Sequence, residues 1–213
     1  RTCYKNVLAL VQPTIARRYS TQIVTCSNLC LGGQLALIAV RILGGISVTS
    51  IEQRDVQAVL AGIDELLPTL RERAQETEDL RKLPDANVKA LEDIGFFKLL
   101  QPEQWGGLQC DPTVFYEAVR RLASACGSTG WVAGIIGVHN WHLALFDQQA
   151  QEDVWGEDTA VRISSSYAPM GAGVVTETGD GYIVNGSWNW SSGCDHATWA
   201  FLGGPVIKDG RPV

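Results

Sequence analysis

Residues 174–186 have the sequence Val-Val-Thr-Glu-Thr-Gly-Asp-Gly-Tyr-Ile-Val-Asn-Gly. Two runs of β-forming residues flank a turn that is rich in glycine and aspartate, a pattern that is typical of a β-hairpin. Residues 161–167 and 198–202 also have the composition of strands. From about residue 159 onward, the chain is therefore predicted to be β structure.

The preceding part of the chain has helical periodicity instead. Apolar residues between Val56 and Leu70 recur three or four positions apart, and Pro68 is expected to kink or restart that helix. Further helices are predicted at about 85–93, 113–125, 129–146 and 148–157. Helices that precede strands in this way predict an α+β fold with segregated layers or two domains.

Residues 1–47 differ from the rest of the chain. They contain no Asp or Glu, and five of the 17 basic residues lie there. The stretch 29–46 is apolar, but Gln34 and Arg41 interrupt it, which does not suit a membrane span. The globular pattern begins at Val48, and a valine codon can serve as a bacterial start, so we interpret this leader as translated upstream sequence. A targeting segment and a genuine structural extension are the alternatives.

The composition argues against several classes of protein. Beyond residue 47 the chain has 12 basic residues (17 minus 5) and 23 acidic ones, which gives a net charge of −11. An acidic body of this kind argues against binding to nucleic acid or to an anionic membrane. The cysteines lack the spacing of a disulfide framework, and the three histidines lack further ligands at metal-binding spacing. We expect reduced cysteines, a cytoplasmic location and no metal.

Aromatic rings and hydrogen-bonding groups occur together in the predicted helix 129–146. Trp131 and His139 lie eight residues apart, which brings them to within about 80° of each other around a helix axis. One side of the helix could therefore present a flat ring and an imidazole together. His139 and His142 are three residues apart and share a face. The same residues are also compatible with a packed core.

Two strand ends show a similar mixture. Ser164-Ser165-Ser166 is followed by Tyr167 and a loop that is rich in Gly and Pro, and the segment 188–192 is Trp-Asn-Trp-Ser-Ser. Strand alternation would place Trp188, Trp190 and Ser192 on one face. Hydroxyl groups and free backbone N–H groups at a strand end suit the polar edge of a planar cofactor. An aromatic-rich strand in a sheet core is the alternative.

Taken together, the motifs resemble a known family. Gln104-Trp-Gly-Gly107 and residues 179–186 are similar to the acyl-CoA dehydrogenase fold. Within that fold, four segments resemble the two-component flavin-dependent aromatic monooxygenases: Gly127-Ser-Thr-Gly-Trp131, Gly137-Val-His-Asn-Trp141, Ile163-Ser-Ser-Ser-Tyr-Ala-Pro-Met170 and Trp190-Ser-Ser-Gly-Cys-Asp-His196. The resemblance covers about 48–213. It implies an all-α domain at 48–158, an incomplete β-barrel or sandwich domain at 159–213, and a missing C-terminal four-helix domain.

The resemblance also implies an activity. A separate reductase would supply reduced FMN or FAD, and the oxygenase would react it with O2 to give a flavin C4a-hydroperoxide. The distal oxygen would then be transferred to the carbon ortho to a phenol hydroxyl, which gives a catechol. A steroid-derived phenol is suggested, and with it a place in steroid or cholesterol degradation. The resemblance further implies a homotetrameric assembly.

Particular residues match the family's functional positions. His139 matches the position beside the phenol hydroxyl, and Ser165 matches the position near the flavin N5 that steadies the peroxide, so these two are the expected catalytic residues. Trp131 matches an aromatic residue beside the flavin ring. The resemblance assigns flavin binding at the two strand ends to Ser165, Ser166, Tyr167, Trp190, Ser191 and Ser192.

Two other interpretations stay open. An acyl-CoA dehydrogenase or a related flavin oxidase would share the fold, although the pattern at His139, Ser165 and Trp190 favours the hydroxylase. A truncated remnant without activity is the second alternative. Because the family's C-terminal helical domain is missing, we expect that residues 1–213 alone do not hydroxylate a phenol.

Overall fold

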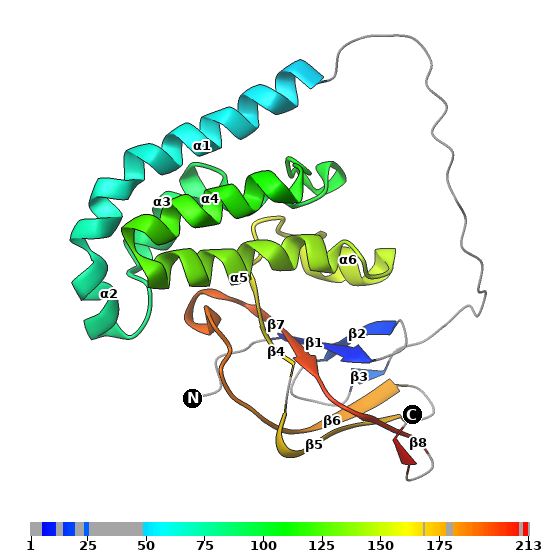
Figure 1. Cartoon of the computed structure of the whole chain (residues 1–213). Helices are drawn as coiled ribbons and strands as arrows, with labels where there is room; N and C mark the ends of the chain where they lie inside the picture. Colours follow the sequence, from blue (N-terminus) through cyan, green and yellow to red (C-terminus); the bar gives the residue numbers. More distant parts are fainter. Residues whose placement is uncertain are drawn as a thin grey trace, which may run out of the picture.

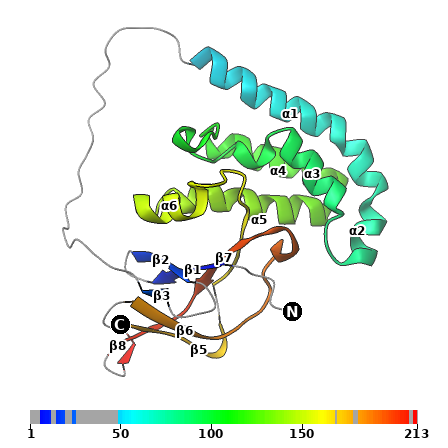
Figure 2. The ribbon, with the colours of Figure 1, turned by 180° about the vertical axis from the view of Figure 1, so that it is seen from behind.

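The computed structural model describes residues 6–11, 15–19, 24–25, 49–167, 169–177, 181–208 and 211–212. The α-helices form one layer and the strands form a second, as the two opposite views in Figures 1 and 2 show. The α-helices occupy residues 49–155, and six strands follow between residues 163 and 212, so the predicted α+β class is confirmed. Within the described ranges, no helix is long and apolar enough to cross a membrane.

The helical layer follows the predicted order of elements. Helix α3 begins after Pro84 and ends before Gly95, which has a φ of +80°, as the sequence predicts. The α-helices are α1 (Thr49–Glu72), α2 (Ala74–Leu80), α3 (Asp85–Asp93), α4 (Pro112–Ala125), α5 (Gly127–Leu143) and α6 (Gln148–Trp155). Three short 3-10 helices are η1 (Phe96–Lys98), η2 (Glu103–Trp105) and η3 (Cys194–His196).

Helix α1 continues through Pro68, so the helix does not restart at this proline. Proline removes one N–H donor, but Pro68 is exposed, whereas Ile63 and Leu70 are buried on another face of the helix. Packing of the buried face outweighs the loss of one hydrogen bond. The break comes later, at Arg73, between α1 and α2.

Close packing between helices fixes the position of α5. The rings of Phe96 and Phe115 lie 5.7 Å apart in the core of the helical layer. A β-carbon at Gly137 would lie 2.6 Å from Cε2 of Phe115, so glycine is what lets α5 approach this ring. At the start of α4, the side chain of Asp111 accepts a hydrogen bond of 2.7 Å from the backbone N–H of Thr113.

The strands form two sheets in the described part of the chain. The first has the order β2 (Ile15–Tyr19), β1 (Asn6–Val11), β7 (Trp199–Gly203), β4 (Ile163–Ser166). The second has the order β3 (Val24–Thr25), β6 (Gly181–Trp188), β5 (Pro169–Glu177), β8 (Val206–Lys208), β9 (Arg211–Pro212). Strands β4 and β7 are parallel, with Ile163 opposite Trp199. Strands β5 and β6 are antiparallel, so the predicted hairpin is confirmed.

Three short segments of residues 1–47 contribute strands to these sheets. Strand β1 pairs with β7 in parallel, and β3 pairs with β6 antiparallel. The interpretation of this leader as upstream sequence or as a targeting segment stays a prediction. The same holds for the domain boundaries at residues 48 and 159.

Candidate functional site

The segment between β6 and η3 contains the first group of predicted site residues. Trp188 ends β6 and donates a 2.7 Å hydrogen bond from its indole to a backbone carbonyl of β7. Trp190 has a φ of +62° and is 91% exposed, so the predicted strand alternation of Trp188, Trp190 and Ser192 is wrong. Gly193 packs closely against α5. A β-carbon at this position would lie 2.8 Å from Cδ1 of Ile136. The chain leaves the sheet after Trp188, and the Trp190 ring is in solvent.

Helix α5 holds the far end of the same segment. The indole Nε1 of Trp131, on the first turns of α5, donates a hydrogen bond of 2.9 Å to Oγ of Ser192. The neighbouring Ser191 Oγ is buried and has no hydrogen-bond partner. A buried hydroxyl in this state costs free energy until a ligand or water satisfies it. The segment therefore contains a hydroxyl group without a partner, that of Ser191. Its neighbours in sequence are Trp190 and Ser192, and Ser192 is bonded to Trp131.

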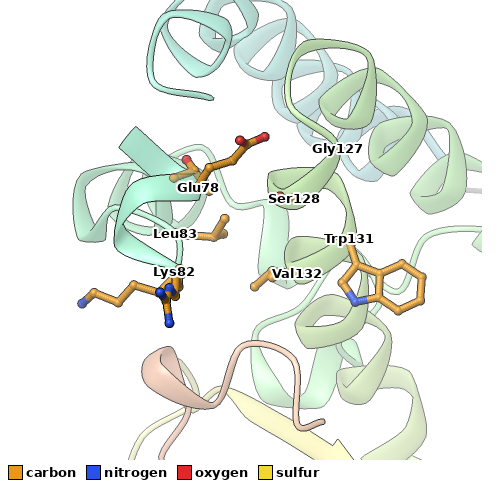
Figure 3. A pocket seen from close by; sticks show the side chains of 9 residues that line it. Glu78, Lys82, Leu83, Gly127, Ser128, Trp131 and Val132 are labelled. Atoms are coloured by element: carbon orange, nitrogen blue, oxygen red, sulfur yellow. The ribbon is translucent and has the colours of Figure 1, made fainter. Parts of the chain in front are cut away.

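Two adjoining cavities lie beside the start of α5. The larger, of about 490 Å³, separates the connection between α2 and α3 from the start of α5, and Leu83 and Val132 face each other across it in Figure 3. The second, of about 290 Å³, is lined by residues 190–193 and by His196, whose buried Nε2 atom also lacks a hydrogen-bond partner. Residues 81–83 line both cavities. The two cavities therefore form one hollow beside residues 189–193, which we call the Trp190 segment.

Sequence reasoning did not predict a role for residues 81–83. They lie in a polar connection whose composition gives no signal of a binding site. Arg81 ends α2 with a φ of +54°, a conformation that is uncommon for residues other than glycine. The placement of Arg81 and Lys82 at the hollow follows from the packing of α2 and α3 beside α5, which local sequence patterns do not indicate.

The end of β4 and the residue after it hold the second group of predicted residues. Ser166 Oγ donates a hydrogen bond of 2.6 Å to the carbonyl of Asn189, which ties this strand end to the Trp190 segment. The hydroxyl of Tyr167 lies 3.0 Å from Nδ1 of His142. Burial raises the pKa of Tyr167, and the Ser165 side chain opposes this rise. Tyr167 and His142 therefore form a small network that joins the end of β4 to α5.

His139 lies next to this network inside the protein. It is 3% exposed, and neither of its ring nitrogens has a hydrogen-bond partner. Its ring centroid lies 5.3 Å from that of Phe201 and 6.1 Å from that of His142, so the predicted shared face of the two histidines is confirmed. Burial, with a smaller contribution from the charge of His142, lowers the pKa of His139 to about 3. Its imidazole is therefore neutral at physiological pH.

The structure does not give Trp131 and His139 the common environment that their helical spacing suggested. Trp131 is 64% exposed and bonds to Ser192, whereas His139 is enclosed by aromatic rings. The site therefore has two parts on α5: an outer one at Trp131 with residues 190–192, and an inner one at His139 and His142 with residues 165–167.

A planar cofactor with a polar edge fits these groups. The unsatisfied Ser191 Oγ and His196 Nε2 atoms supply hydrogen-bonding capacity, and the exposed indoles of Trp131 and Trp190 offer flat apolar faces. The described ranges contain no group of three or more His, Cys, Asp and Glu side chains that could hold a metal ion. Cys110 and Cys126 are free thiols, and burial raises the pKa of Cys110 to about 11.

Comparison with known proteins places this arrangement in a family. The family model described as "Acyl-CoA dehydrogenase, N-terminal domain" matches residues 55–160. Over 166 residues the chain is 76% identical to the "Flavin-dependent monooxygenase, oxygenase subunit HsaA" of Mycobacterium tuberculosis (strain ATCC 25618 / H37Rv), a match that covers 78% of this chain and 42% of that protein. Over 151 residues it is 78% identical to the protein of the same name from Rhodococcus jostii (strain RHA1), with 71% and 39% covered.

Solved structures agree with these matches. The crystal structure of the HsaA monooxygenase from M. tuberculosis has a TM-score of 0.73 and 74% identity, with 75% of this chain and 42% of that chain covered. XiaF from Streptomyces sp., in complex with FADH2 and glycerol, has a TM-score of 0.70 and 28% identity, with 79% and 42% covered.

The fold is thus that of the acyl-CoA dehydrogenases, with its site at the junction of the helical and β layers. Within this fold, the chain is similar to part of the oxygenase components of flavin-dependent monooxygenases. It spans about two fifths of the length of the HsaA proteins that it matches.

Proposed function

We propose that this chain is part of the oxygenase component of a two-component flavin-dependent monooxygenase that hydroxylates a phenol ortho to its hydroxyl group and yields a catechol. The observation that carries the proposal is the 76% identity to an HsaA oxygenase subunit over 166 residues. Two further relatives, each 38% identical over 157 residues, are named as p-hydroxyphenylacetate and resorcinol hydroxylases. Both of those substrates are phenols, which supports the proposed substrate class.

Reduced flavin is the proposed cofactor, either FMN or FAD, and a separate reductase is the proposed partner that supplies it. The XiaF structure contains FADH2, and the resorcinol hydroxylase is named as FADH(2)-dependent. The residues that would hold the flavin are Trp131, Ser165, Ser166, Tyr167, Trp190, Ser191 and Ser192. When bound, reduced flavin supplies the electrons that allow O2 to deliver one oxygen atom to the aromatic ring.

His139 and Ser165 are the proposed catalytic residues. The neutral imidazole of His139 has a free lone pair, so it can accept a hydrogen bond from the phenol hydroxyl and increase the electron density of the ring. The Ser165 hydroxyl can hydrogen-bond to the cofactor or the substrate. Because Phe201 and Tyr167 enclose His139, they would also keep water away from the reacting groups.

The finer assignments concern substrate and assembly. We propose a steroid-derived phenol as substrate, because HsaA subunits are the relatives with the highest identities given above, and a homotetramer as the assembly. We also propose that residues 1–213 alone do not hydroxylate. The chain covers 42% of the HsaA length, and the remaining pocket walls would come from a C-terminal helical domain.

The deciding experiment supplies the full-length protein with a flavin reductase, a nicotinamide reductant, isotopically labelled O2 and a phenol. We expect a catechol that contains one labelled oxygen atom, detected by mass spectrometry. Formation of an enoyl thioester from an acyl-CoA, with no labelled catechol from any phenol tested, would instead establish a dehydrogenase. The same assay on residues 1–213 tests the proposed inactivity, which product formation would overturn.

A further inference from the structure

The hollow beside the Trp190 segment is large enough to hold a small molecule. Its larger cavity, of about 490 Å³, is within the usual range of small-molecule sites. Leu83 and Val132 form apolar walls on opposite sides of this cavity (Figure 3). Trp131 and residues 190–192, which are proposed to hold the flavin, border the two cavities. A molecule in the hollow would therefore lie next to the bound flavin.

The charges that line the hollow favour a neutral ligand. Among the described residues there, two cations, Arg81 and Lys82, are balanced by two carboxylates, those of Glu78 and Asp195. Lys82 is also paired with Asp85, at a distance of 3.1 Å. A phosphate or a carboxylate would gain no net attraction from this lining and would lose its hydration. An uncharged molecule therefore suits the hollow better than an acyl-CoA, which carries phosphates.

The imidazole of His196 indicates which polar group the ligand should carry. It lines the smaller cavity, its side chain is 6% exposed, and its Nε2 atom has no hydrogen-bond partner. Its Nδ1 atom lies 3.6 Å from the carboxylate of Asp85, which favours a proton on Nδ1 and a lone pair on Nε2. Arg81 lines the same cavity and can donate hydrogen bonds. A hydroxyl group could bond to both residues, and a carbonyl group could accept from Arg81.

The open side of α5 leads from the hollow toward His139. Trp131, Ile135 and Val138 lie four and three residues apart, so they share one side of the helix, and each is at least partly exposed. Ile136, by contrast, is buried. His139, where the phenol hydroxyl is proposed to bind, follows Trp131 by eight residues (139 minus 131), a rise of about 12 Å. An elongated molecule can therefore extend from one to the other along an apolar surface.

We propose that the hollow is the subsite for the remote end of the phenolic substrate, an uncharged, elongated molecule whose remote end carries a carbonyl or hydroxyl group. The inference rests on the proposed function, because the reacting phenol ring is that of the proposed reaction. That ring lies toward His139, and the apolar body continues between Leu83 and Val132. The oxygen group at the far end meets Arg81 and His196. A phenol with a single ring would leave the hollow empty.

Binding of short and long phenols tests this subsite without relying on turnover. The full-length protein is loaded with reduced flavin in the absence of O2 and titrated with a short phenol, 4-methylphenol, and with three long ones. Of these, 4-cyclohexylphenol has no second oxygen, 4-(4-hydroxycyclohexyl)phenol carries a hydroxyl, and 4-(4-hydroxyphenyl)cyclohexanone carries a carbonyl. We expect at least one of the two oxygen-bearing long phenols to bind about tenfold more tightly than 4-methylphenol, because it buries more apolar surface. The tighter of the two identifies the recognised group.

Ser128→Phe blocks the larger cavity from an exposed position on the first turn of α5. We expect it to weaken binding of the long phenols about tenfold, while the affinities for 4-methylphenol and for flavin stay within about twofold. The matched control is Ser124→Phe, which adds the same ring at an exposed position of α4 outside the lining of both cavities. Val132→Phe fills the hollow from its wall and decides if Ser128→Phe does not fold, as judged by circular dichroism.

His196→Leu tests the polar end of the subsite separately. Leucine keeps much of the bulk of the side chain but forms no hydrogen bond. We expect the oxygen-bearing long phenol that binds more tightly to lose about fivefold in affinity, whereas 4-cyclohexylphenol should change by less than about twofold. Equal losses for these two phenols would contradict recognition of an oxygen group by His196.

Three results would overturn the subsite as a whole. The first is a wild-type protein that binds the long phenols no more tightly than 4-methylphenol. The second is an equal effect of Ser128→Phe on short and long phenols. The third is an equal loss of flavin affinity in that variant, because the hollow would then belong to the flavin. Failure of the proposed function is a separate outcome, in which the wild type makes no catechol from any of these phenols, whatever their affinities.

Discussion

The indole Nε1 of Trp131 donates a 2.9 Å hydrogen bond to Oγ of Ser192, which lies 61 residues further along the chain. This bond connects the first turns of α5 to the irregular segment between β6 and η3. It is the direct link between a helix and a strand end that both belong to the proposed flavin site. Its removal therefore tests whether the two parts must be held together to bind flavin.

Trp131→Phe keeps an aromatic ring and removes this hydrogen bond. Since the bond is solvent-exposed, we expect the free energy of unfolding to fall by no more than about 1 kcal/mol. Flavin affinity should fall about three- to tenfold, because Ser192 loses its fixed position. Titration of the full-length protein with flavin, followed by fluorescence, measures the affinity. An unchanged affinity would show that the bond has no part in flavin binding.

Trp190→Asn should weaken flavin binding without lowering the stability of the fold. A tryptophan with a φ of +62° is strained, and asparagine tolerates this conformation better. Because Trp190 is 91% exposed, its removal loses little buried area. We expect the free energy of unfolding to stay constant or to rise by about 1 kcal/mol, while flavin affinity falls about tenfold through the lost ring contact. Urea unfolding and flavin titration measure the two effects, and a loss of stability would contradict the account of strain.

Gln151→Leu should destabilise the junction between η2 and α6. The Gln151 amide accepts a hydrogen bond of 3.0 Å from the indole of Trp105 and donates to the carbonyls of Ala144 and Phe146. Leucine has a similar size but leaves these groups unsatisfied, so a loss of about 1–3 kcal/mol is expected in urea unfolding. Gln149→Leu, on the exposed side of the same helix, is the control and should change stability by less than about 0.5 kcal/mol. Equal effects would contradict the explanation.

The buried His139 should make stability depend on pH. In the folded protein it becomes protonated only near pH 3, whereas the ordinary pKa is 6.5. The unfolded chain therefore binds more protons between these values, so the free energy of unfolding rises with pH across this window and the full contribution is present above it. We expect stability to fall between about pH 6.5 and pH 5 by up to about 1.4 kcal/mol per unit for this residue.

His139→Gln, which does not titrate, is the variant that isolates this effect. Urea unfolding at several pH values should give a shallower pH dependence for the variant than for the wild type. His142 and His196 also have pKa values lowered by burial, so part of the dependence should persist. Identical slopes for the two proteins would show that His139 is accessible to protons in the folded state.

The sequence predicted those elements whose ends depend on local residues. Helix α3 is bounded by Pro84 and Gly95, and the β5–β6 hairpin by its turn composition, so both could be predicted from short segments. Pro68 was misleading, because burial of the neighbouring apolar residues of α1 is a tertiary effect. Strand β6 ends at Trp188, and Trp190 has a φ of +62°, so strand alternation could not predict its conformation. Close packing of Gly193 against Ile136, 57 positions away (193 minus 136), is likewise a tertiary feature.

In the candidate site, too, some features could be predicted from the sequence and others depend on tertiary packing. The resemblance to the flavin-dependent monooxygenases identified the motifs that contain the candidate residues. In the structure, hydrogen bonds join Ser166 to Asn189 and Trp131 to Ser192. The contribution of Arg81 and Lys82 to the hollow could not be predicted, because it depends on how α2 and α3 pack. His142 was visible only as a neighbour of His139 on one helix face. Its bond to Tyr167 required the pairing of β4 with β7, which positions the end of β4.

The parallel pairing of β4 with β7 has a consequence for the order in which the protein folds. Ile163 pairs with Trp199, which lies 36 positions further along the chain (199 minus 163), and Arg162 joins Glu92 across 70 positions. Contacts between distant positions form more slowly than those within helices, because long loops must first be closed. We therefore expect the helical layer to form early and the residues of the site to come together among the last steps. A nascent chain would then acquire its binding capacity late, well after most of its helices are in place.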